Sequence, residues 1–301
     1  MSTPSGPADQ PSTPRDGDAI RVVCVAYNPG PELAEFAASL RTATTRPVTL
    51  VLADNGDDPT VVDDVASRAG AVVLRAGRNL GYGAAANRGA QDGDEPWVVV
   101  ANTDIVWHPG SLDTLVDAAH RYPRGGSFGP AVLNTDGTRY PSARALPSFT
   151  SGVGHAVLGR VWPDNPWTRA YRSDAASQDE RPAGWLSGSC LLLRREAFEE
   201  VGGFDEGYFM FFEDVDLGER LGRRGWANVH VPSAAVTHVG GTSWRERPAP
   251  MIRAHHRSAA RYVARHYPHA YQWPLRAAAR LGLRVREAWE TRAVGPEGTD
   301  R

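Results

Sequence analysis

The densest group of chemically competent side chains lies between residues 209 and 217. There the sequence runs Phe-Met-Phe-Phe-Glu-Asp-Val-Asp-Leu, so an aromatic run leads into the carboxylates of Glu213, Asp214 and Asp216. Apolar neighbours raise a carboxyl pKa by desolvation, and carboxylates that lie close together raise one another's pKa further. A carboxylate in such surroundings can take a hydroxyl proton near neutral pH. The pattern also suits an acid-rich helix N-terminus, which the macrodipole favours, and both interpretations stay open.

Three other polar clusters each follow an apolar run that is typical of a buried strand. These clusters are Asn28 after residues 20–27, Asp54-Asn55 after residues 48–53, and Asn102-Thr103-Asp104 after residues 97–101. Taken singly, each could be turn chemistry, because Asn, Asp and Gly dominate turns. Ligands of an open parallel sheet bind beyond the carboxyl ends of its strands, so the recurrence indicates a binding site at that edge.

Two of the polar residues have the chemistry of metal ligands. Asp104 offers a hard oxygen to Mg²⁺ or Mn²⁺, and His238, at the end of a late apolar run, could complete such a site or be purely structural. The glycine-rich stretch 77–87 contains no G-x-G-x-x-G fingerprint; its small residues allow either close backbone approach to a ligand or tight helix packing. All 33 basic residues are arginine, which excludes lysine-dependent chemistry such as a Walker A loop or a Schiff base.

The elements that must position these residues alternate between strand and helix in the first half of the chain. Short runs that are apolar on both faces predict strands, and the segments between them have helical spacing. We expect strands at 20–27, 48–53, 71–75 and 97–101, and helices at 31–41, 59–69, 81–91 and from Pro109 onward. This alternation predicts an α/β fold with a mostly parallel central sheet flanked by helices.

The second half of the chain is less regular. Residues 134–183 are predicted to form long functional loops, with one short helix near 151–159. Order is predicted to return with strands at 188–194, 229–232 and 235–238 and with helices at 195–201 and 213–224. Residues 1–19 have the composition of a disordered tail.

Composition bounds the class of protein. The 301 residues include 41% hydrophobic and 23% charged side chains, which suits a globular protein. No apolar run is long enough to cross a bilayer, and the N-terminus has no apolar core of the kind a secretory signal needs. The two cysteines, Cys24 and Cys190, exclude a disulfide framework and fit a reducing compartment.

The C-terminal region is strongly basic. Residues 251–292 hold nine arginines and only two acids, a net charge of +7 in a chain whose total is −2. Four arginines share one helical face, and three more repeat the four-residue spacing after Pro268 and Pro274 interrupt it; they are Arg253, Arg257, Arg261, Arg265, Arg276, Arg280 and Arg284. The stripe is either a solvated helix face or an interfacial helix pair for an anionic membrane surface.

Taken together, the motifs resemble those of inverting family 2 glycosyltransferases with the GT-A fold. The resemblance spans about 20–245. It is carried by V-A-Y-N-P (25–29), A-D-N-G (53–56), N-L-G-Y-G-A-A-A-N (79–87), N-T-D (102–104), W-L-S-G-S-C-L-L-L-R-R (185–195), G-G-F-D-E-G-Y-F-M-F-F-E-D-V-D-L (202–217) and T-H (237–238). Within the family, the chain is most similar to rhamnosyltransferases of arabinogalactan linkage-unit synthesis in the bacterial cell wall. Y-P-S-A-R (140–144) and W-P-D-N-P-W (162–167) are among the weaker motifs for that assignment.

The resemblance implies a role for each matching residue. Asp214 corresponds to the catalytic base, with Glu213 beside it, and Asp104 and His238 correspond to metal ligands for Mg²⁺ or Mn²⁺. The nucleotide-sugar site is implied to include Tyr27, Asn28, Asp54, Asn55, Asn79, Gly81, Asn87, Asn102, Thr103 and Asp104. Trp185, Gly188 and Ser189 are implied to lie near the sugar and acceptor. Two departures stand out, since Asn102 replaces the first Asp of the family's D-x-D motif and Asp57 stands where Ser is frequent.

The implied reaction moves L-rhamnose from dTDP-L-rhamnose to the 3-hydroxyl of N-acetylglucosamine on decaprenyl (polyprenyl) diphosphate, with inversion. The implied location is the cytoplasm, peripheral on the inner face of the plasma membrane, with no nucleic-acid partner. Alternatives are a family 2 transferase with another nucleotide-sugar donor or glycan acceptor, a sugar nucleotidyltransferase, and a non-catalytic glycan- or membrane-binding protein on the same fold. Residues 25–30 lack the glycine-rich triphosphate loop that a nucleotidyltransferase needs.

The resemblance also implies a domain organisation. A disordered tail (1–19) precedes a GT-A glycosyltransferase domain at 20–245. That domain has a nucleotide-sugar half at about 20–130 and an acceptor half at about 131–245. A basic helical, membrane-proximal extension (246–292) and a short tail (293–301) follow.

Overall fold

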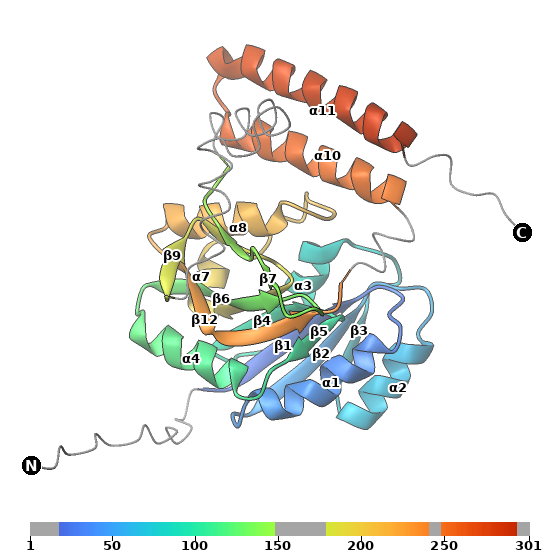
Figure 1. The fold of residues 1–301 in the computed structure, drawn as a ribbon, viewed down its shortest axis with the longest axis vertical. Coiled ribbons are helices and arrows are strands. Elements are labelled where there is room, and N and C mark those ends of the chain that lie inside the picture. The colour runs from blue at the N-terminus through green and yellow to red at the C-terminus, as the bar shows by residue number, and fades with distance from the viewer. Residues whose placement is uncertain (1–17, 148–178, 241–247, 294–301) are drawn as a thin grey trace, which may run out of the picture.

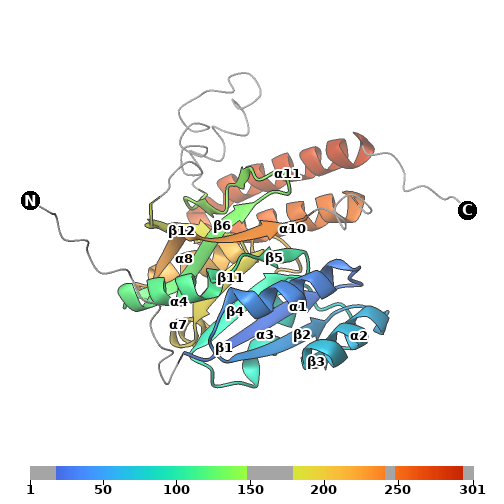
Figure 2. The same cartoon turned by 60° about the horizontal axis from the view of Figure 1, so that its bottom comes forward.

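The computed structural model describes residues 18–147, 179–240 and 248–293 (Figure 1). A central sheet carries helices on both faces, and two long C-terminal helices lie side by side beyond one end of the body (Figures 1 and 2). The strand order is β3-β2-β1-β4-β11-β6-β12-β5. The strands of this path are β1 (Ile20–Ala26), β2 (Val48–Asp54), β3 (Val72–Arg75), β4 (Trp97–Asn102), β5 (Ile105–Trp107), β6 (Gly125–Leu133), β11 (Cys190–Arg194) and β12 (Ala227–His238).

The first half of the sheet is parallel. β1 pairs in parallel with both β2 and β4, and β2 pairs in parallel with β3. β1 is rich in β-branched residues and is buried along nearly its whole length, as expected for a strand covered on both faces. β11 inserts antiparallel between β4 and β6, and β6 pairs in parallel with β12. The predicted α/β fold, with a mostly parallel sheet in its first half and C-terminal helices, is confirmed.

Two apolar clusters hold the helices against the sheet. One contains Leu33, Phe36, Leu112 and Leu115 and lies on the face covered by α1, α2 and α4; the other contains Phe198 and lies on the face of α3, α7 and α8. The helices of these two layers are α1 (Glu32–Ala43), α2 (Thr60–Ala69), α3 (Tyr82–Gln91), α4 (Ser111–Arg121), α7 (Arg195–Glu200) and α8 (Glu213–Arg223). Because both faces are covered, the open carboxyl edge of the parallel strands is the place where a site can form.

Short strand pairs complete the second half of the chain. They are β7 (Arg139–Tyr140), β8 (Ala143–Arg144), β9 (Arg181–Ala183) and β10 (Trp185–Leu186). β8 and β10 form a separate two-stranded sheet, whereas β7 pairs with β6 and β9 with β12. These strands lie at the two ends of the region predicted as loops. The short helix expected near 151–159 and the motif at 162–167 lie outside the described residues.

Several sequence predictions needed correction. β5 and β6 were not predicted; β6 contains three glycines and a proline, and so lacks a strand-like composition. The strands expected at 229–232 and 235–238 are one strand, β12, with a register shift between Val231 and Ala235. The helix expected to open at Pro109 begins at Ser111.

The N-terminal tail was expected to extend to residue 19. Asp18 is instead buried, and its carboxylate lies 3.4 Å from Arg46 Nε and 3.0 Å from His120 Nε2. The other domain boundaries stay predictions. Cys24 and Cys190 are both buried and unbridged, as the cysteine count predicted.

The C-terminal region forms α10 (Pro248–His266), a 3₁₀ turn η1 (Ala270–Gln272) and α11 (Trp273–Ala293). α10 and α11 pack along each other, and Pro268 falls in the connection between them. Pro274 lies in the first turn of α11, where its missing N–H is not needed. None of the helices in the described ranges is long and apolar enough to cross a membrane.

Candidate active site

The acidic motif begins α8 after two residues with unusual backbone geometry. Phe211 and Phe212 have φ angles of 68° and 65°, a left-handed conformation that bulky residues rarely adopt. Two hydrogen bonds hold this segment, from Tyr82 N to Phe209 O at 2.9 Å and from Ser258 Oγ to Met210 O at 2.7 Å. The strained turn is therefore fixed by α3 on one side and α10 on the other, and it sets where the acids point.

Asp214 is tied to the turn that follows β10. Its Oδ2 accepts a hydrogen bond from Gly188 N at 2.9 Å, and its Oδ1 accepts one from Val215 N at 2.8 Å. Burial raises the pKa of Asp214, and the hydrogen bonds from Gly188 and Val215 oppose that rise only in part. The carboxylate is thus held in one orientation and is more basic than an ordinary aspartate, which is what proton abstraction from an alcohol requires.

Glu213 is the more strongly perturbed of the two acids. Its side chain is 6% exposed, and Oε2 has no hydrogen-bond partner among the described residues. Burial, and then the neighbouring charge of Asp214, raise the pKa of Glu213 to about 8. Below that pH Glu213 keeps its proton and places no second negative charge beside Asp214.

Asp104 and His238 come together although 134 positions separate them in the sequence. His238 Nε2 lies 3.1 Å from Asp104 Oδ1, and Asn102 Nδ2 lies 3.4 Å from the same nitrogen. Asp104 Oδ1 is buried and has no hydrogen bond of good geometry within the described part of the chain. An oxygen and an imidazole nitrogen aimed at one point fit a divalent cation that takes its other ligands from a diphosphate. No cluster of three or more His, Cys, Asp or Glu side chains able to hold a metal occurs in the described ranges.

The ends of β1 and β2 are linked through polar side chains. Asn28 has a φ of 44°, donates from Nδ2 to Asp57 Oδ1 at 2.6 Å, and accepts from Asp57 N at 3.0 Å. Asp57, which departs from the family pattern, is thus a side-chain partner of Asn28. Asp54 is buried, accepts from Gly56 N at 3.0 Å, and lies 3.3 Å from Arg75 Nε.

The loop before α3 is built around one asparagine and one glycine. Asn55 donates to Gly81 O at 3.0 Å and accepts from Leu80 N at 3.3 Å, while Asn79 Oδ1 accepts from Gly81 N at 2.9 Å. Gly81 has a φ of 87°, and a Cβ there would lie 2.3 Å from Phe209 O. Only glycine fits at position 81. The loop before α3 and the turn that contains Phe209 are therefore in direct contact.

The other predicted site residues differ in placement. Asn87 binds the 203–206 turn, with Nδ2 donating to Phe204 O at 2.9 Å and Oδ1 accepting from Phe204 N at 2.8 Å, so both ends of its amide are occupied. Ser189 O accepts a hydrogen bond from Asn102 N at 3.0 Å. This bond links the turn beside Asp214 to the end of β4. Tyr27 is 43% exposed at the same edge. The roles assigned to these residues and to Thr103 stay predictions.

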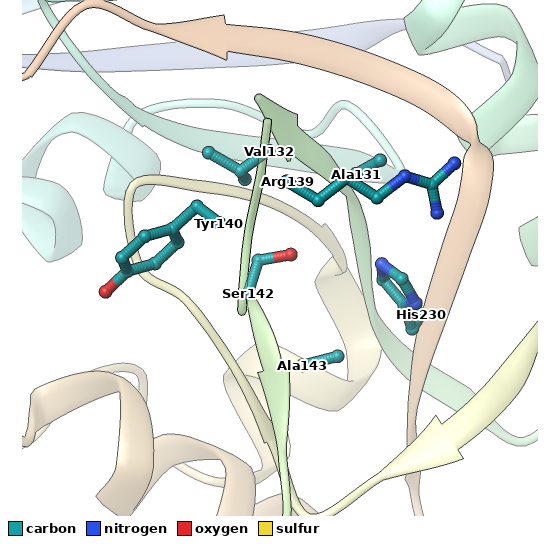
Figure 3. A pocket seen from close by; sticks show the side chains of 7 residues that line it. All are labelled: Ala131, Val132, Arg139, Tyr140, Ser142, Ala143 and His230. Atoms are coloured by element: carbon teal, nitrogen blue, oxygen red, sulfur yellow. The ribbon is translucent and has the colours of Figure 1, made fainter. Parts of the chain in front are cut away.

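A small cavity near β7 is separate from this edge. It has a volume of about 10 Å³ and is lined by Arg139, Tyr140 and His230 among others (Figure 3). Such a volume admits one water molecule and no nucleotide. Burial, with the charges of Arg181 and Arg139, lowers the pKa of His230 to about 4, so this histidine is neutral at pH 7.

Sequence reasoning missed two contributors to the site. The Tyr82 hydroxyl donates to Gly188 O, and burial raises the pKa of this phenol well above its ordinary value. Ser258 reaches the acidic turn from α10, a helix that had been interpreted either as a solvated face or as a membrane-surface helix. Tyr82 lies within a motif that was recognised, whereas no local pattern marks Ser258 as a neighbour of the site.

Comparisons with known proteins give a consistent result. Residues 17–258 match the model of a family described as glycosyltransferase like family 2. The chain is 50% identical over 281 residues to N-acetylglucosaminyl-diphospho-decaprenol L-rhamnosyltransferase of Mycobacterium tuberculosis H37Rv, covering 89% of this chain and 92% of that protein. It is also 40% identical over 177 residues to rhamnosyltransferase WbbL of Escherichia coli K12, covering 57% and 63%.

Solved structures share the fold at low sequence identity. GalNAc-T7 with UDP, GalNAc and Mn²⁺ aligns with a TM-score of 0.54 at 17% identity, over 73% of this chain and 43% of that one. The mannosyltransferase PcManGT of Pyrobaculum calidifontis, in complex with GDP-Man and Mn²⁺, aligns with a TM-score of 0.54 at 16% identity, over 90% and 71%. Both are glycosyltransferases, and at these identities they establish the GT-A fold.

Proposed function

The chain belongs to glycosyltransferase-like family 2, and on that premise we propose that it transfers L-rhamnose from dTDP-L-rhamnose to the 3-hydroxyl of N-acetylglucosamine on a polyprenyl diphosphate. The reaction serves arabinogalactan linker synthesis in the cell wall. The name of the mycobacterial relative, which is 50% identical to this chain with 92% of its length covered, supports the transferred sugar and the acceptor. The observation that carries the catalytic part is the half-buried, oriented carboxylate of Asp214 beside Gly188 N.

In this mechanism Asp214 accepts the proton of the acceptor hydroxyl. The freed oxygen attacks the anomeric carbon from the face opposite dTDP, a new C–O bond forms, and the bond to the diphosphate breaks. Glu213 keeps its proton below about pH 8, so the second carboxyl adds no negative charge next to the nucleophile. Gly188 N and Val215 N fix the carboxylate during the transfer. Base catalysis of this kind contributes about 10²- to 10⁴-fold in rate.

Asp104 and His238 would hold a divalent cation, either Mg²⁺ or Mn²⁺. Such an ion supplies positive charge for the diphosphate of the donor. Asn102, at 3.4 Å from the same imidazole, orients His238 but adds no negative charge. We expect weaker metal affinity than in relatives with a complete D-x-D motif.

The outer face of α11 supports attachment to the inner surface of the plasma membrane, where a lipid-linked acceptor resides. Trp273, Leu281, Val285 and Trp289 are 54–65% exposed. The last three are four residues apart and therefore share one face of the helix. An exposed apolar row flanked by basic residues is typical of a helix that lies in the headgroup region.

Charge is segregated on α11 in the direction that an anionic surface favours. Glu290 faces α10, where its Oε2 lies 3.7 Å from His256 Nε2 and its Oε1 accepts from Arg286 Nε at 2.7 Å. Glu287 lies in the half-buried row, whereas Arg280 and Arg284 are exposed. Each basic residue near an anionic surface contributes about 1 kcal/mol of attraction.

Vesicle flotation tests the membrane assignment. The protein should float with vesicles containing phosphatidylglycerol more than with phosphatidylcholine vesicles, and high salt should reduce the difference. Val285→Glu should weaken flotation, whereas Val72→Glu, at an exposed valine on the far strand β3, should not. Equal binding to both lipids, or equal effects of the two substitutions, would remove α11 from the proposal.

A transfer assay tests the donor and the acceptor. Protein, Mg²⁺ or Mn²⁺, and a short-chain polyprenyl-diphospho-N-acetylglucosamine are incubated with dTDP-L-rhamnose, and UDP- and GDP-sugars run in parallel. Mass spectrometry should find a rhamnosylated lipid with dTDP-L-rhamnose alone. Product from another donor would overturn the sugar assignment, and binding of nucleotide sugar without any product would favour a binding protein or another acceptor.

A further inference from the structure

Arg144 occupies a defined place that the proposed mechanism does not use. Its guanidinium carbon lies 5.4 Å from the ring centre of Tyr140 and 5.3 Å from that of Trp185. Arg144 and Trp185 are also directly paired across the small sheet of β8 and β10. The Nε of Arg144 donates a hydrogen bond to Pro141 O at 2.8 Å, and the two aromatic faces further limit the rotation of the guanidinium.

Tyr140 reaches this position because of strand alternation. In Figure 3, Arg139 and His230 lie together on one side of β7, whereas Tyr140 points away on the other. The Arg144 shelf, defined here as Arg144 with the rings of Tyr140 and Trp185, therefore adjoins the small cavity through Tyr140, which also lines it.

The Arg144 shelf is connected to the catalytic carboxylate by close packing. A Cβ on Gly218 of α8 would lie 2.8 Å from Trp185 Cβ, so β10 and α8 are in direct contact. The chain then runs from Trp185 to Gly188, whose N–H holds Asp214 at the start of α8. The positive charge of Arg144 acts on Asp214 as well, since it opposes the rise that burial causes in the pKa of Asp214.

The acceptor in the proposed function has a specific charge distribution. Its reacting hydroxyl and its diphosphate are on the same sugar ring, so a hydroxyl at Asp214 brings two or more negative charges close to an acidic motif. Such an arrangement is unfavourable unless a cation lies on the diphosphate side. Arginine is well suited because its planar N–H groups match phosphate oxygens in pairs.

We propose that Arg144, held between Tyr140 and Trp185, binds the diphosphate of the lipid-linked acceptor and so places its sugar hydroxyl at Asp214. This inference rests on the proposed acceptor class. The donor also contains a diphosphate, but the residues proposed to serve it are at the other end of the 187–189 turn. Asp104 and His238 lie near the end of β4, which is bonded to Ser189, whereas Arg144 is paired with Trp185, before the turn. The shelf also adjoins α10, because Trp185 packs on the cluster that contains Tyr262.

The test compares acceptors with and without a diphosphate. Wild type, Arg144→Gln and Arg144→Lys are assayed with polyprenyl-diphospho-N-acetylglucosamine and with an alkyl glycoside of N-acetylglucosamine. Arg144→Gln should raise KM for the diphosphate acceptor about 10- to 100-fold, the range for loss of one charge-assisted hydrogen bond. KM for the neutral glycoside should stay unchanged. Arg144→Lys, which keeps the positive charge, should bring KM for the diphosphate acceptor part of the way back to the wild-type value. Arg124→Gln is the matched control, since Arg124 also stacks on a tryptophan, Trp226, at 4.0 Å.

Two binding measurements distinguish the sources of diphosphate. Calorimetric titration with dTDP should give the same Kd for wild type and Arg144→Gln, and titration with geranyl diphosphate in the presence of dTDP should give weaker binding to the variant. An unchanged preference for the diphosphate acceptor overturns the inference and leaves the proposed function standing, as does an equal loss of dTDP affinity. If wild type transfers rhamnose to neither acceptor, the proposed function fails, and the geranyl diphosphate titration still decides whether Arg144 binds a lipid diphosphate.

Discussion

Replacing Asp214 with asparagine separates its chemical role from its structural one. Gly188 N and Val215 N donate to different oxygens of Asp214, at 2.9 and 2.8 Å, so an asparagine oxygen can keep only one of these hydrogen bonds while the side chain keeps its size. Asp214→Asn should therefore melt at a somewhat lower temperature but still fold and bind dTDP like wild type. It cannot take a proton, so kcat should fall about 10²- to 10⁴-fold, equivalent to about 3–5 kcal/mol of lost transition-state stabilisation.

The pH dependence of the transfer rate should show two ionisations, first that of Asp214 and then that of Glu213. Activity of wild type should rise with pH as Asp214 ionises, with an apparent pKa above that of an ordinary aspartate because the group is buried. A second ionisation should occur near pH 8, where Glu213 loses its proton. Glu213→Gln should remove that second ionisation and retain the acid-side rise, because Glu213 is already neutral while Asp214 titrates.

The assay is initial-rate rhamnosyl transfer between pH 5 and 9.5, at saturating donor, with melting temperatures and dTDP affinities measured on the same preparations. A fall of less than tenfold in Asp214→Asn would refute the assignment of the base. The assignment would pass to Glu213 if Glu213→Gln lost activity while Asp214→Asn kept it.

Three further substitutions test other parts of the account. Because burial lowers the pKa of His230 to about 4 from 6.5, the unfolded chain binds the extra proton first as pH falls, and about 3 kcal/mol of stability should be lost between pH 6.5 and 4. Urea unfolding of His230→Gln should show a pH dependence smaller by that amount. Asn102→Asp should tighten Mn²⁺ binding at least tenfold by calorimetry, about a third of the roughly 4 kcal/mol Coulomb energy of two unit charges at 4 Å; unchanged affinity would place the ion elsewhere. Arg261→Ala removes a bidentate pair with Asp205 at 2.9 and 3.0 Å. It should lower the melting temperature slightly and kcat several-fold without changing donor KM, and an unchanged kcat would show that α10 does not position the acidic turn.

Much of the first half of the fold was predictable from sequence because its signals are local. The strands at 20–26 and 48–54 are rich in β-branched and other apolar residues, and α1 and α2 have clear apolar periodicity. By contrast, β6 contains Gly-Gly and Gly-Pro, and its strand conformation comes from pairing with β11 and β12 rather than from propensity.

The candidate site was predictable as a set of residues but not as a geometry. The motif order gave Asp104, His238 and Asp214, and the structure brings the first two to 3.1 Å. The contacts of Asn55 and Asn87 with backbone groups of neighbouring loops depend on tertiary packing that no spacing rule contains. The same is true of Arg144, whose place is set by pairing with a residue 41 positions away.

The configuration and linkage of the product test the central claim most directly. Rhamnose transferred by wild type from dTDP-L-rhamnose to the lipid-linked N-acetylglucosamine can be analysed by NMR for its anomeric configuration and its point of attachment. A single displacement assisted by Asp214 predicts attachment at O3 with an anomeric configuration opposite to that of the donor. Retained configuration, or attachment at another oxygen, would contradict it.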